Sequence, residues 1–320
     1  MKKYVSLSFC FIFAFLCACS EQQTSDTQFL FDTVVTLSAD CDEATLSGAF
    51  DLCRKLENTL SITKEESDVY KLNRSKNGVK VTDDTKILVE KALYFCKLSG
   101  GKFDITVYPL SSLWNIKEEV VPSKDEIAEA LKNVDYESVS VTEDSILTEG
   151  KQIDLGGIAK GYIAEKTLEY FKNKGVKTGI INMGGNIIVF GDKDYTVGIK
   201  EPFSDNGISA TLKLRNKSVV TSGVYERCFK KDGKLYHHII DTKTGYPADT
   251  DLLSATIICD DSTLGDAFST ICILYGKEAA TEFIESRRKI DKVEAVFIDK
   301  DYNITYTSGI KKDGKYLVLK

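Results

Sequence analysis

Residues 154–162 read Asp154-Leu155-Gly156-Gly157-Ile158-Ala159-Lys160-Gly161-Tyr162, and the patterns on either side organise the middle of the chain. An apolar alternation over Gln152–Leu155 predicts a strand, and a helical period predicts an amphipathic helix over Ile158–Lys174. A second strand is expected over Gly179–Phe190. The Asp154 carboxylate would then lie beside a helix start, where backbone N–H groups favour anions and glycine admits close approach. A tight structural turn with a packing glycine is the alternative interpretation.

Hydrophobic periodicity outside this unit predicts strands and helices in mixed order. Before the unit we expect a strand near Phe29–Ser38, helices over Glu43–Leu60, Thr82–Ser99 and Ser123–Val134, and short strands near Ser138–Val141 and Ile146–Thr148. After it we expect mostly strands over Tyr195–Ile258, helices over Ser262–Tyr275 and Ala279–Arg288, and strands over Val293–Ile298 and Asn303–Tyr306. The fold class is therefore α+β, with mixed β-sheets packed against helices.

The N-terminus has the pattern of an export signal. Lys2 and Lys3 precede an apolar run over Tyr4–Ala18 that stops at Cys19. A run of about 15 residues is shorter than the ~20 that a spanning helix needs. We expect a signal peptide over residues 1–18, a tether anchored by lipid on Cys19 over residues 19–26, and a folded domain over residues 27–320. An ordinary secretory signal is the alternative; the lipoprotein reading implies an exported protein on a bacterial membrane, facing the periplasm from the inner membrane.

Composition excludes several classes of function. The formal net charge is −6 and basic residues are scattered among acids, so we expect no nucleic-acid partner. Neither a GxxxxGK[ST] loop nor a GxGxxG motif after a strand occurs, which argues against a P-loop or a Rossmann dinucleotide site. Beyond the signal region, six cysteines form no CxxC pair, so a zinc site is not expected. We expect mostly buried thiols, with one or two disulfides left open.

Asp266, Ser269 and Thr270 lie at positions i, i+3 and i+4 of a predicted helix. This spacing places them on one face. A carboxylate with two hydroxyls is a hard oxygen cluster that suits Mg²⁺, which completes its shell with water and substrate phosphates. Alternatively, Asp266 simply stabilises the first helical turn.

The chain has two histidines, and they are adjacent: His237 and His238. Neighbours in a strand point to opposite faces, so one can face a site while the other faces core or solvent. Any acid or base built on histidine must be one of these two. A purely structural role is the alternative for each.

Six sequence blocks follow one another along the chain. They are Gly101–Val107 with Pro109, Leu110 and Trp114; Ile153–Gly161; Asn182–Asn186; Thr221–Arg227; His238–Asp241 with Thr244 and Gly245; and Asp266–Thr270. Their order resembles the ApbE family of FAD:protein FMN transferases over most of the mature chain. The sequence departs from the commoner family pattern at Phe31, where methionine is more usual, and at Thr63, where an aromatic residue is frequent.

The resemblance implies a site and a mechanism. It implies Mg²⁺ held by Asp266, Ser269, Thr270 and the main chain at Gly157. It implies contacts with FAD, as substrate, from Phe31, Thr63, Lys102, Phe103, Asp104, Asp154, Lys160 and Ile240. The implied reaction is phosphoryl transfer, in which a target threonine attacks the FMN phosphorus and AMP leaves. His238 is our candidate for activating the hydroxyl, and Asp241 for supporting it.

Three other functions fit parts of the pattern. If water attacks instead, the protein is a Mg²⁺-dependent FAD pyrophosphatase that gives FMN and AMP. A lipid-anchored flavin-binding protein without turnover would lack a metal carboxylate, and Asp266 argues against it. The glycine and acid blocks argue against a purely structural lipoprotein. The expected partners are target flavoprotein subunits of membrane redox complexes.

Overall fold

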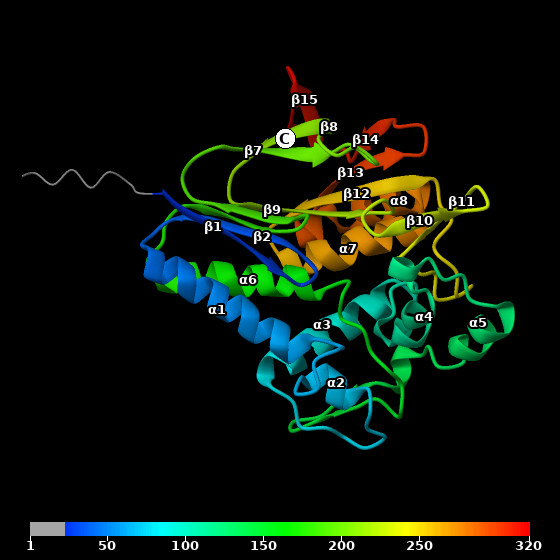
Figure 1. The fold of residues 1–320 in the computed structure, drawn as a ribbon. Helices are drawn as coiled ribbons and strands as arrows, with labels where there is room; N and C mark the ends of the chain where they lie inside the picture. The colour runs from blue at the N-terminus through cyan, green and yellow to red at the C-terminus, as the bar shows by residue number, and fades with distance from the viewer. Residues whose placement is uncertain (1–22) are drawn as a thin grey trace, which may run out of the picture.

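The computed structural model describes residues 23–320, so the predicted signal peptide and Cys19 lie outside the described residues. An eight-stranded sheet runs through the molecule in the order β1-β2-β5-β6-β9-β12-β13-β14. Its strands are β1 (Gln23–Leu30), β2 (Thr33–Asp40), β5 (Gly179–Met183), β6 (Asn186–Phe190), β9 (Lys217–Gly223), β12 (Leu252–Cys259), β13 (Glu294–Asp299) and β14 (Ile304–Tyr306). Helices cover one face of the sheet, and a smaller sheet covers part of the other (Figure 1). The α+β class with mixed sheets is confirmed.

The strand β12 lies inside the large sheet, between β9 and β13, and is covered on both faces. All eight of its residues, Leu252–Cys259, are buried. Ala255 and Ile257 belong to the core on the helix side, whereas Ile258 belongs to the core on the other side. A strand covered on both faces has a nearly continuous apolar sequence rather than a strict alternation.

The helical layer contains most of the predicted helices, with ends close to those expected. Its members are α1 (Glu43–Leu60), α2 (Asp68–Leu72), α3 (Asp83–Leu98), α6 (Ala159–Asn173), α7 (Ser262–Tyr275) and α8 (Lys277–Asp291). The ends of α1 and α7 match the prediction, and α3 is capped by Thr82 as expected. Side chains at N-caps supply hydrogen bonds that the first helical N–H groups lack, so these starts are readable from sequence.

A four-stranded sheet lies over the other face of the large sheet. It contains β7 (Tyr195–Lys200), β8 (Ile208–Leu214), β15 (Ile310–Asp313) and β16 (Tyr316–Leu319), in the order β15-β16-β8-β7. The sequence pattern ended with β14, so the β15–β16 hairpin was missed. Two short strands, β3 (Ser140–Val141) and β4 (Ile146–Leu147), pair with each other as expected.

A small subdomain beside the sheet is built around Trp114. It contains the 3₁₀ turns η1 (Ile105–Val107), η2 (Ile116–Glu118) and η3 (Tyr136–Ser138), the helices α4 (Tyr108–Leu113) and α5 (Lys124–Leu131), and, packed nearby, the hairpin β10 (Cys228–Lys231) and β11 (Lys234–His237). The predicted capping box of Ser123 and Glu126 opens α5. Trp114 is buried, and its Nε1–H donates to the Gly245 carbonyl at 2.7 Å. That bond joins the subdomain to the loop after β11.

Four local predictions were wrong. The single strand expected over Gly179–Phe190 is the antiparallel pair β5 and β6, which turns at Gly184 and Gly185, both with positive φ. The expected single strand near Phe29–Ser38 is the β1–β2 hairpin, whose turn residues Phe31 and Asp32 both have φ of 55°. Because β1 begins at Gln23, residues 23–26 of the expected tether belong to this strand instead.

The segment Gln152–Leu155 is not a strand, although Ile153 and Leu155 are buried as the alternation predicted. The N–H of Ile153 donates to the Asn73 side chain and that of Asp154 to the Ile105 carbonyl. These partners replace a strand ladder. The predicted strand–helix–strand unit therefore begins with an irregular segment.

The six cysteines of the described residues are all free, and four of them are buried, as expected for mostly buried thiols. Burial raises the pKa of the Cys53 thiol to about 11. Over residues 23–320, no helix combines the length and apolar character of a membrane span.

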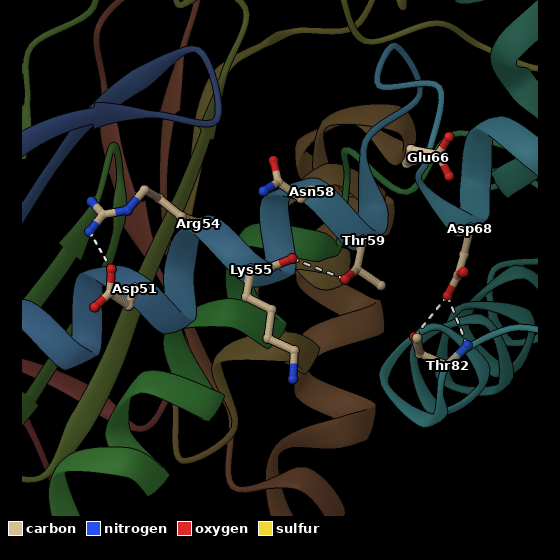
Figure 2. A pocket seen from close by; sticks show the side chains of 8 residues that line it. All are labelled: Asp51, Arg54, Lys55, Asn58, Thr59, Glu66, Asp68 and Thr82. Carbon is tan, nitrogen blue, oxygen red and sulfur yellow. Dashed lines mark hydrogen bonds and ion pairs between the residues drawn. The ribbon is translucent and has the colours of Figure 1, made fainter.

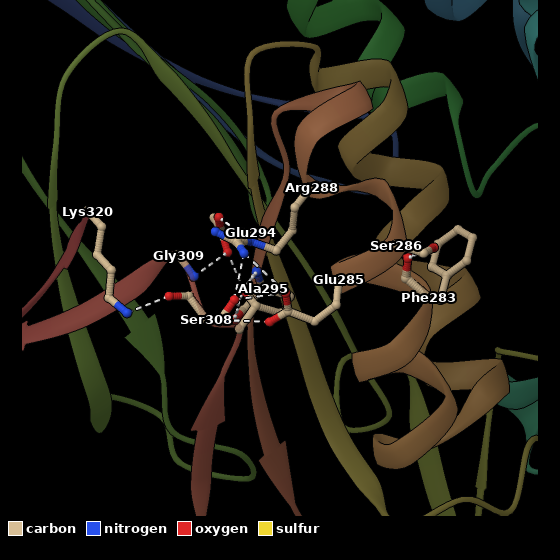
Figure 3. A network of polar contacts seen from close by, with 10 residues as sticks. Phe283, Glu285, Ser286, Arg288, Glu294, Ala295, Ser308, Gly309 and Lys320 are labelled. Atoms are coloured by element: carbon tan, nitrogen blue, oxygen red, sulfur yellow. Dashed lines mark hydrogen bonds and ion pairs between the residues drawn. The ribbon is translucent and has the colours of Figure 1, made fainter.

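The C-terminal strands are tied to α8 by polar contacts (Figure 3). Arg288 contacts Glu294 on β13 at 2.7 Å, and Glu285 accepts from the Ser308 hydroxyl at 2.9 Å. Lys320 donates to the Ser308 carbonyl. This network holds the end of the chain against the edge of the large sheet.

Candidate functional site

A cavity of about 1030 Å³ lies between the Trp114 subdomain, the start of α6 and the face of α7. It is large enough for a drug-sized or dinucleotide ligand. Eleven of the fourteen residues predicted for the flavin, metal and catalytic roles line it: Thr63, Lys102, Phe103, Asp104, Asp154, Gly157, Lys160, His238, Ile240, Asp266 and Thr270. Phe31, Asp241 and Ser269 do not line it, although each contacts or neighbours a residue that does.

Asp266 is the buried carboxylate of the cavity, with a relative exposure of 2%. Its Oδ2 accepts from the Gly161 N–H at 2.8 Å, and its Oδ1 lies 3.6 Å from the Lys160 ammonium. A Cβ on Gly161 would lie 2.2 Å from the Ser262 carbonyl oxygen, so only glycine allows α6 to approach α7 this closely. This contact orients one carboxylate oxygen and leaves the other facing the cavity-lining Lys160.

Hydroxyl oxygens gather beside Asp266. The Ser222 hydroxyl lies 2.7 Å from that of Ser269 and 3.3 Å from that of Thr270. A Cβ on Gly157 would lie 3.8 Å from the Thr270 hydroxyl, so the Gly157 main chain is close to this group. Residues 23–320 contain no cluster of three or more His, Cys, Asp or Glu side chains arranged for a metal. One carboxylate with hydroxyl and backbone oxygens nevertheless suits Mg²⁺, which takes few protein ligands.

Asp154 organises the glycine turn before α6. One of its carboxylate oxygens accepts from the Gly156 N–H at 2.8 Å, and the other accepts from the Ser111 hydroxyl at 3.3 Å. Asp154 therefore stabilises the turn, and its side chain also lines the cavity. Lys160, the second residue of α6, supplies a cation between this turn and Asp266.

Phe103 and Asp104 form part of the same wall in different ways. The Phe103 ring approaches Gly157, where an added Cβ would lie 3.0 Å from it. Asp104 is buried and accepts from the N–H and hydroxyl of Thr106 and from the Tyr136 N–H. Burial raises the pKa of the Asp104 carboxyl, while these hydrogen bonds oppose the rise. Asp104 thus stabilises the wall that presents Phe103.

The two histidines face opposite environments, as the alternation predicted. His237 is buried and its Nε2 bonds the Ala248 carbonyl, a structural role. His238 lines the cavity, and its Nδ1 lies 3.3 Å from the Arg227 carbonyl. Because a carbonyl only accepts, Nδ1 carries the proton of the neutral ring and Nε2 keeps its lone pair. Burial, reinforced by the Arg227 guanidinium, lowers the pKa of His238 well below its ordinary value, which keeps the ring neutral at pH 7.

Asp241 was expected to support His238, but its side chain contacts Lys102 instead. Its Oδ2 pairs with the Lys102 ammonium at 3.0 Å, and both side chains are largely buried. The Thr242 hydroxyl donates to the Gly101 carbonyl at 2.7 Å. These two bonds join the turn after β11 to the loop before η1. Asp241 therefore positions Lys102 and the cavity wall.

The three remaining residues predicted to contact the flavin, Phe31, Thr63 and Ile240, differ in how they are placed. Phe31 lies outside the lining, whereas its neighbour Asp32 lines it. Thr63 lines it together with Ile62, and its side chain is exposed. Ile240 is buried in the Trp114 cluster and also faces the cavity.

Among the lining residues that were absent from the predicted site, three bond to predicted site residues: Ser222, Ser111 and Arg227. Ser222 and Arg227 fall within the Thr221–Arg227 block, so their block was visible although their roles were not assigned. Ser111 stands on α4, and nothing in the local sequence distinguishes it from a helical surface serine. Long-range contacts alone bring it to Asp154.

A second depression of about 570 Å³ lies on the outer face of α1, away from these residues (Figure 2). Arg54 pairs with Asp51 on the same helix, and Asp68 accepts from the N–H and hydroxyl of Thr82. Arg54 and Asp68 are thus satisfied by neighbouring groups. None of the predicted site residues lines it, and the larger cavity is the candidate site.

Comparison with known proteins agrees with this geometry. The chain is 34% identical over 276 residues to the FAD:protein FMN transferase of Klebsiella pneumoniae, covering 83% of this chain and 86% of the relative. It is 33% identical over 293 residues to that of Treponema pallidum, covering 83% and 80%. The crystal structure of the ApbE protein of Thermotoga maritima matches with a TM-score of 0.83 and 30% identity, over 90% of this chain and 97% of that one. Residues 31–297 match the model of the ApbE family, to which this chain belongs.

Proposed function

We propose that this protein transfers FMN from FAD to a threonine hydroxyl of a membrane redox protein and releases AMP. The observation that carries the proposal is the placement of Asp266, Lys160 and His238 around one cavity of about 1030 Å³. A carboxylate that can hold Mg²⁺, a cation beside the phosphates and a base for the incoming hydroxyl together suit phosphoryl transfer. The relatives named FAD:protein FMN transferase support the choice of substrate.

Asp266, Ser269, Thr270 and the main chain at Gly157 would hold Mg²⁺ in this proposal. One oxygen of the buried Asp266 carboxylate accepts from the Gly161 N–H, and the other lies 3.6 Å from the Lys160 ammonium. A carboxylate oriented in this way fits an oxygen-ligated cation. When bound, Mg²⁺ supplies charge neutralisation for the FAD diphosphate. Lys160 lies where it can add a second positive charge to the same phosphates.

The chain's own groups then account for the transfer. His238 Nε2 accepts the proton of the threonine hydroxyl, because Nδ1 is already committed to the Arg227 carbonyl. The threonine oxygen forms a bond to the FMN phosphorus as the bond from that phosphorus to the bridging oxygen breaks. The bridging oxygen leaves with AMP. Lys102 forms an ion pair with Asp241. Lys102 and Phe103 line the part of the cavity where the rest of the ligand would lie.

We further propose that the protein is exported and held on a membrane by lipid on Cys19. The apolar run that ends at Cys19 supports this location. A Cys19→Ala variant is expected to leave the membrane fraction and appear in the soluble fraction. Retention of that variant on the membrane would contradict lipid anchoring at this residue.

One assay tests the activity. The full chain is incubated with FAD, Mg²⁺ and a purified flavoprotein subunit of a membrane redox complex, and flavin fluorescence is read on the denatured subunit. A subunit whose acceptor threonine is changed to valine is the control. Labelling that requires both Mg²⁺ and the threonine supports the transferase. Free FMN and AMP without labelled subunit would instead identify an FAD pyrophosphatase, and unchanged FAD a binding protein.

A further inference from the structure

The β10–β11 hairpin connects the cavity to the surface. Cys228 and Phe229, at the start of β10, line the cavity, and His238 follows the last residue of β11. Within the part of the chain that the structure describes, these two strands pair with each other and with no third strand. The hairpin therefore projects from the cavity wall, beside α4 (Figure 1).

Aromatic stacking fixes the base of the hairpin. The Phe229 and Tyr236 rings face each other across the strands at 5.2 Å, and Tyr236 stacks on Trp114 at 5.5 Å. The tip residues Asp232 and Gly233 both have positive φ, which is the pattern of a two-residue type I′ turn. A rigid base and a tight turn hold the tip at a constant distance from the cavity. Lys231 is two residues beyond Phe229, about 7 Å along the strand.

The tip is basic although the whole chain is acidic. The residues Cys228–His237 include three lysines, Lys230, Lys231 and Lys234, against one acid, Asp232, in a chain of net charge −6. All three lysines are exposed, and none of them forms an ion pair within residues 23–320. We call these three side chains the basic tip. A distance of about 7 Å is within the Debye length of ~8 Å at physiological salt, so their charge reaches the cavity rim.

An exposed aromatic residue adjoins the basic tip. The Lys230 ammonium lies 5.6 Å from the centre of the Phe203 ring. Phe203 has a φ of 59° and is 47% exposed. A bulky residue in the left-handed region is uncommon, and such strain concentrates at functional surfaces. The tip thus combines positive charge with an apolar contact, which is a combination suited to a protein partner.

We propose that the basic tip docks an acidic surface of the acceptor protein, next to the threonine that enters the cavity. This inference rests on the proposed function. FAD is also anionic, but the basic tip does not line the cavity, where Lys102, Lys160 and Arg227 already supply cations. His238 directly follows β11, so an acceptor whose hydroxyl reaches His238 would lie close to the hairpin. Complementary charge at that position raises the rate of productive encounter.

The chain offers a matched control. Lys311, Lys312 and Lys315 stand in the same five-residue sequence, Lys-Lys-Asp-Gly-Lys, on the β15–β16 hairpin of the small sheet. They are also exposed. The test compares the full-length wild type, the triple variant K230E/K231E/K234E and the triple variant K311E/K312E/K315E. Both variants change the net charge equally, so only the position of the change differs.

The measurements are KM and kcat for labelling of the redox subunit, and the Kd for FAD. The basic-tip variant is expected to raise the KM for the subunit about tenfold while kcat and the Kd for FAD stay within twofold of wild type. The control variant is expected to match wild type in all three. Added salt should raise the KM of the wild type and control but lower that of the basic-tip variant, because salt screens the repulsion between its glutamates and the acidic surface.

Each remaining outcome overturns the docking inference. Equal KM values for the two triple variants would place the acceptor elsewhere, and a weakened Kd for FAD in the basic-tip variant alone would assign these lysines to the nucleotide. Near-ultraviolet circular dichroism checks that each variant is folded, and the single variant K231E replaces a triple variant that is not. Failure of the proposed function is distinct, because then the wild type itself labels no subunit.

Discussion

The two Lys-Lys-Asp-Gly-Lys hairpins have the same five residues but different turns. In the first, Lys231 pairs with Lys234, and Asp232 and Gly233 both have positive φ. In the second, Asp313 pairs with Tyr316, and of the two turn residues only Gly314 has positive φ, the pattern of a type II′ turn. The turn centre has moved by one residue.

The difference follows from the neighbours of each hairpin. The strand β16 also pairs with β8, where Leu317 lies opposite Leu212, so the small sheet fixes its position along β15. The strands β10 and β11 have no such third strand in the described residues, and they adopt the type I′ turn that Asp-Gly favours. Local sequence decides a turn only where tertiary pairing leaves it free.

The largest expected difference in transfer rate is between variants of two buried acids, Asp266 in the cavity and Asp299 on the C-terminal side. Asp266→Asn is expected to lower FMN transfer about 10³-fold, because it removes the charge of the oxygen cluster. Asp299→Asn, at the end of β13, should leave the transfer rate within twofold of wild type. Steady-state rates of labelling and of AMP release measure both. A similar loss in the two variants would mean that burial of any acid, and not its position, controls activity.

Asp299 should affect stability, and in a pH-dependent way. A hydrogen bond from Lys277 lowers the pKa of the Asp299 carboxyl, although burial opposes this. A depressed carboxyl pKa contributes stability above the unfolded value of about 4, and that contribution disappears as pH falls through the folded value. The difference in Tm between wild type and Asp299→Asn should therefore be larger at pH 7 than at pH 3. An equal difference at both pH values would contradict this role.

His238→Ala is expected to lower transfer about 10²-fold, since general base catalysis contributes that order of acceleration. His237→Ala should act on Tm instead, because His237 bonds the Ala248 carbonyl. In the wild type, the low pKa of His238 predicts that the rate stays constant from pH 7.5 to 6.5. A pH–rate profile measures this. A fall in rate centred near pH 6.5 would show a histidine with an ordinary pKa.

Trp114→Phe should lower the free energy of unfolding by about 1 to 2 kcal/mol, because the Gly245 carbonyl loses its buried donor. The stacking on Tyr236 that supports the first hairpin would be weakened as well. Phe229→Leu is the comparison, since it keeps the Gly245 bond while changing the stack. Urea unfolding of both variants distinguishes the two contributions. An unchanged midpoint for Trp114→Phe would exclude the bond as a tie between subdomain and sheet.

The smallest effect compares the turns themselves. Gly233→Ala and Gly314→Ala each place a Cβ at positive φ with no atom within 4 Å, so each should cost about 1 kcal/mol of stability. Only Gly233→Ala should also raise the KM for the acceptor, by displacing the basic tip. Thermal melts and labelling kinetics test the pair. An effect of Gly314→Ala on KM would remove the functional distinction between the hairpins.

Helices were predicted well where a residue type has one strongly preferred position, such as a helix N-cap. The caps Thr82 and Ser123 and the apolar period of α1 located their helices. The β1–β2 turn was missed because Phe31-Asp32 has no glycine or asparagine, and only Asp32 belongs to a residue type that tolerates positive φ. The segment before Gly156 was misread because Asn73, some eighty residues earlier, satisfies its backbone groups. Local patterns cannot show such distant partners.

The site follows the same rule. The spacing of Asp266, Ser269 and Thr270 predicted a shared helical face, and the structure places them together. The alternation of strand residues left His237 and His238 open, the family resemblance favoured His238, and the fold turns His237 to Ala248 and His238 to the cavity. Asp241 was given a partner by proximity in sequence, whereas Lys102 reaches it from 139 residues away.

Under the proposed function, the contact at Gly161 couples stability to catalysis at one position. One added methyl group would meet the Ser262 carbonyl oxygen at 2.2 Å and would force the two helices apart. The same movement would withdraw the N–H that holds Asp266. A larger side chain at position 161 would therefore lower both the packing of α6 against α7 and the rate of the proposed reaction.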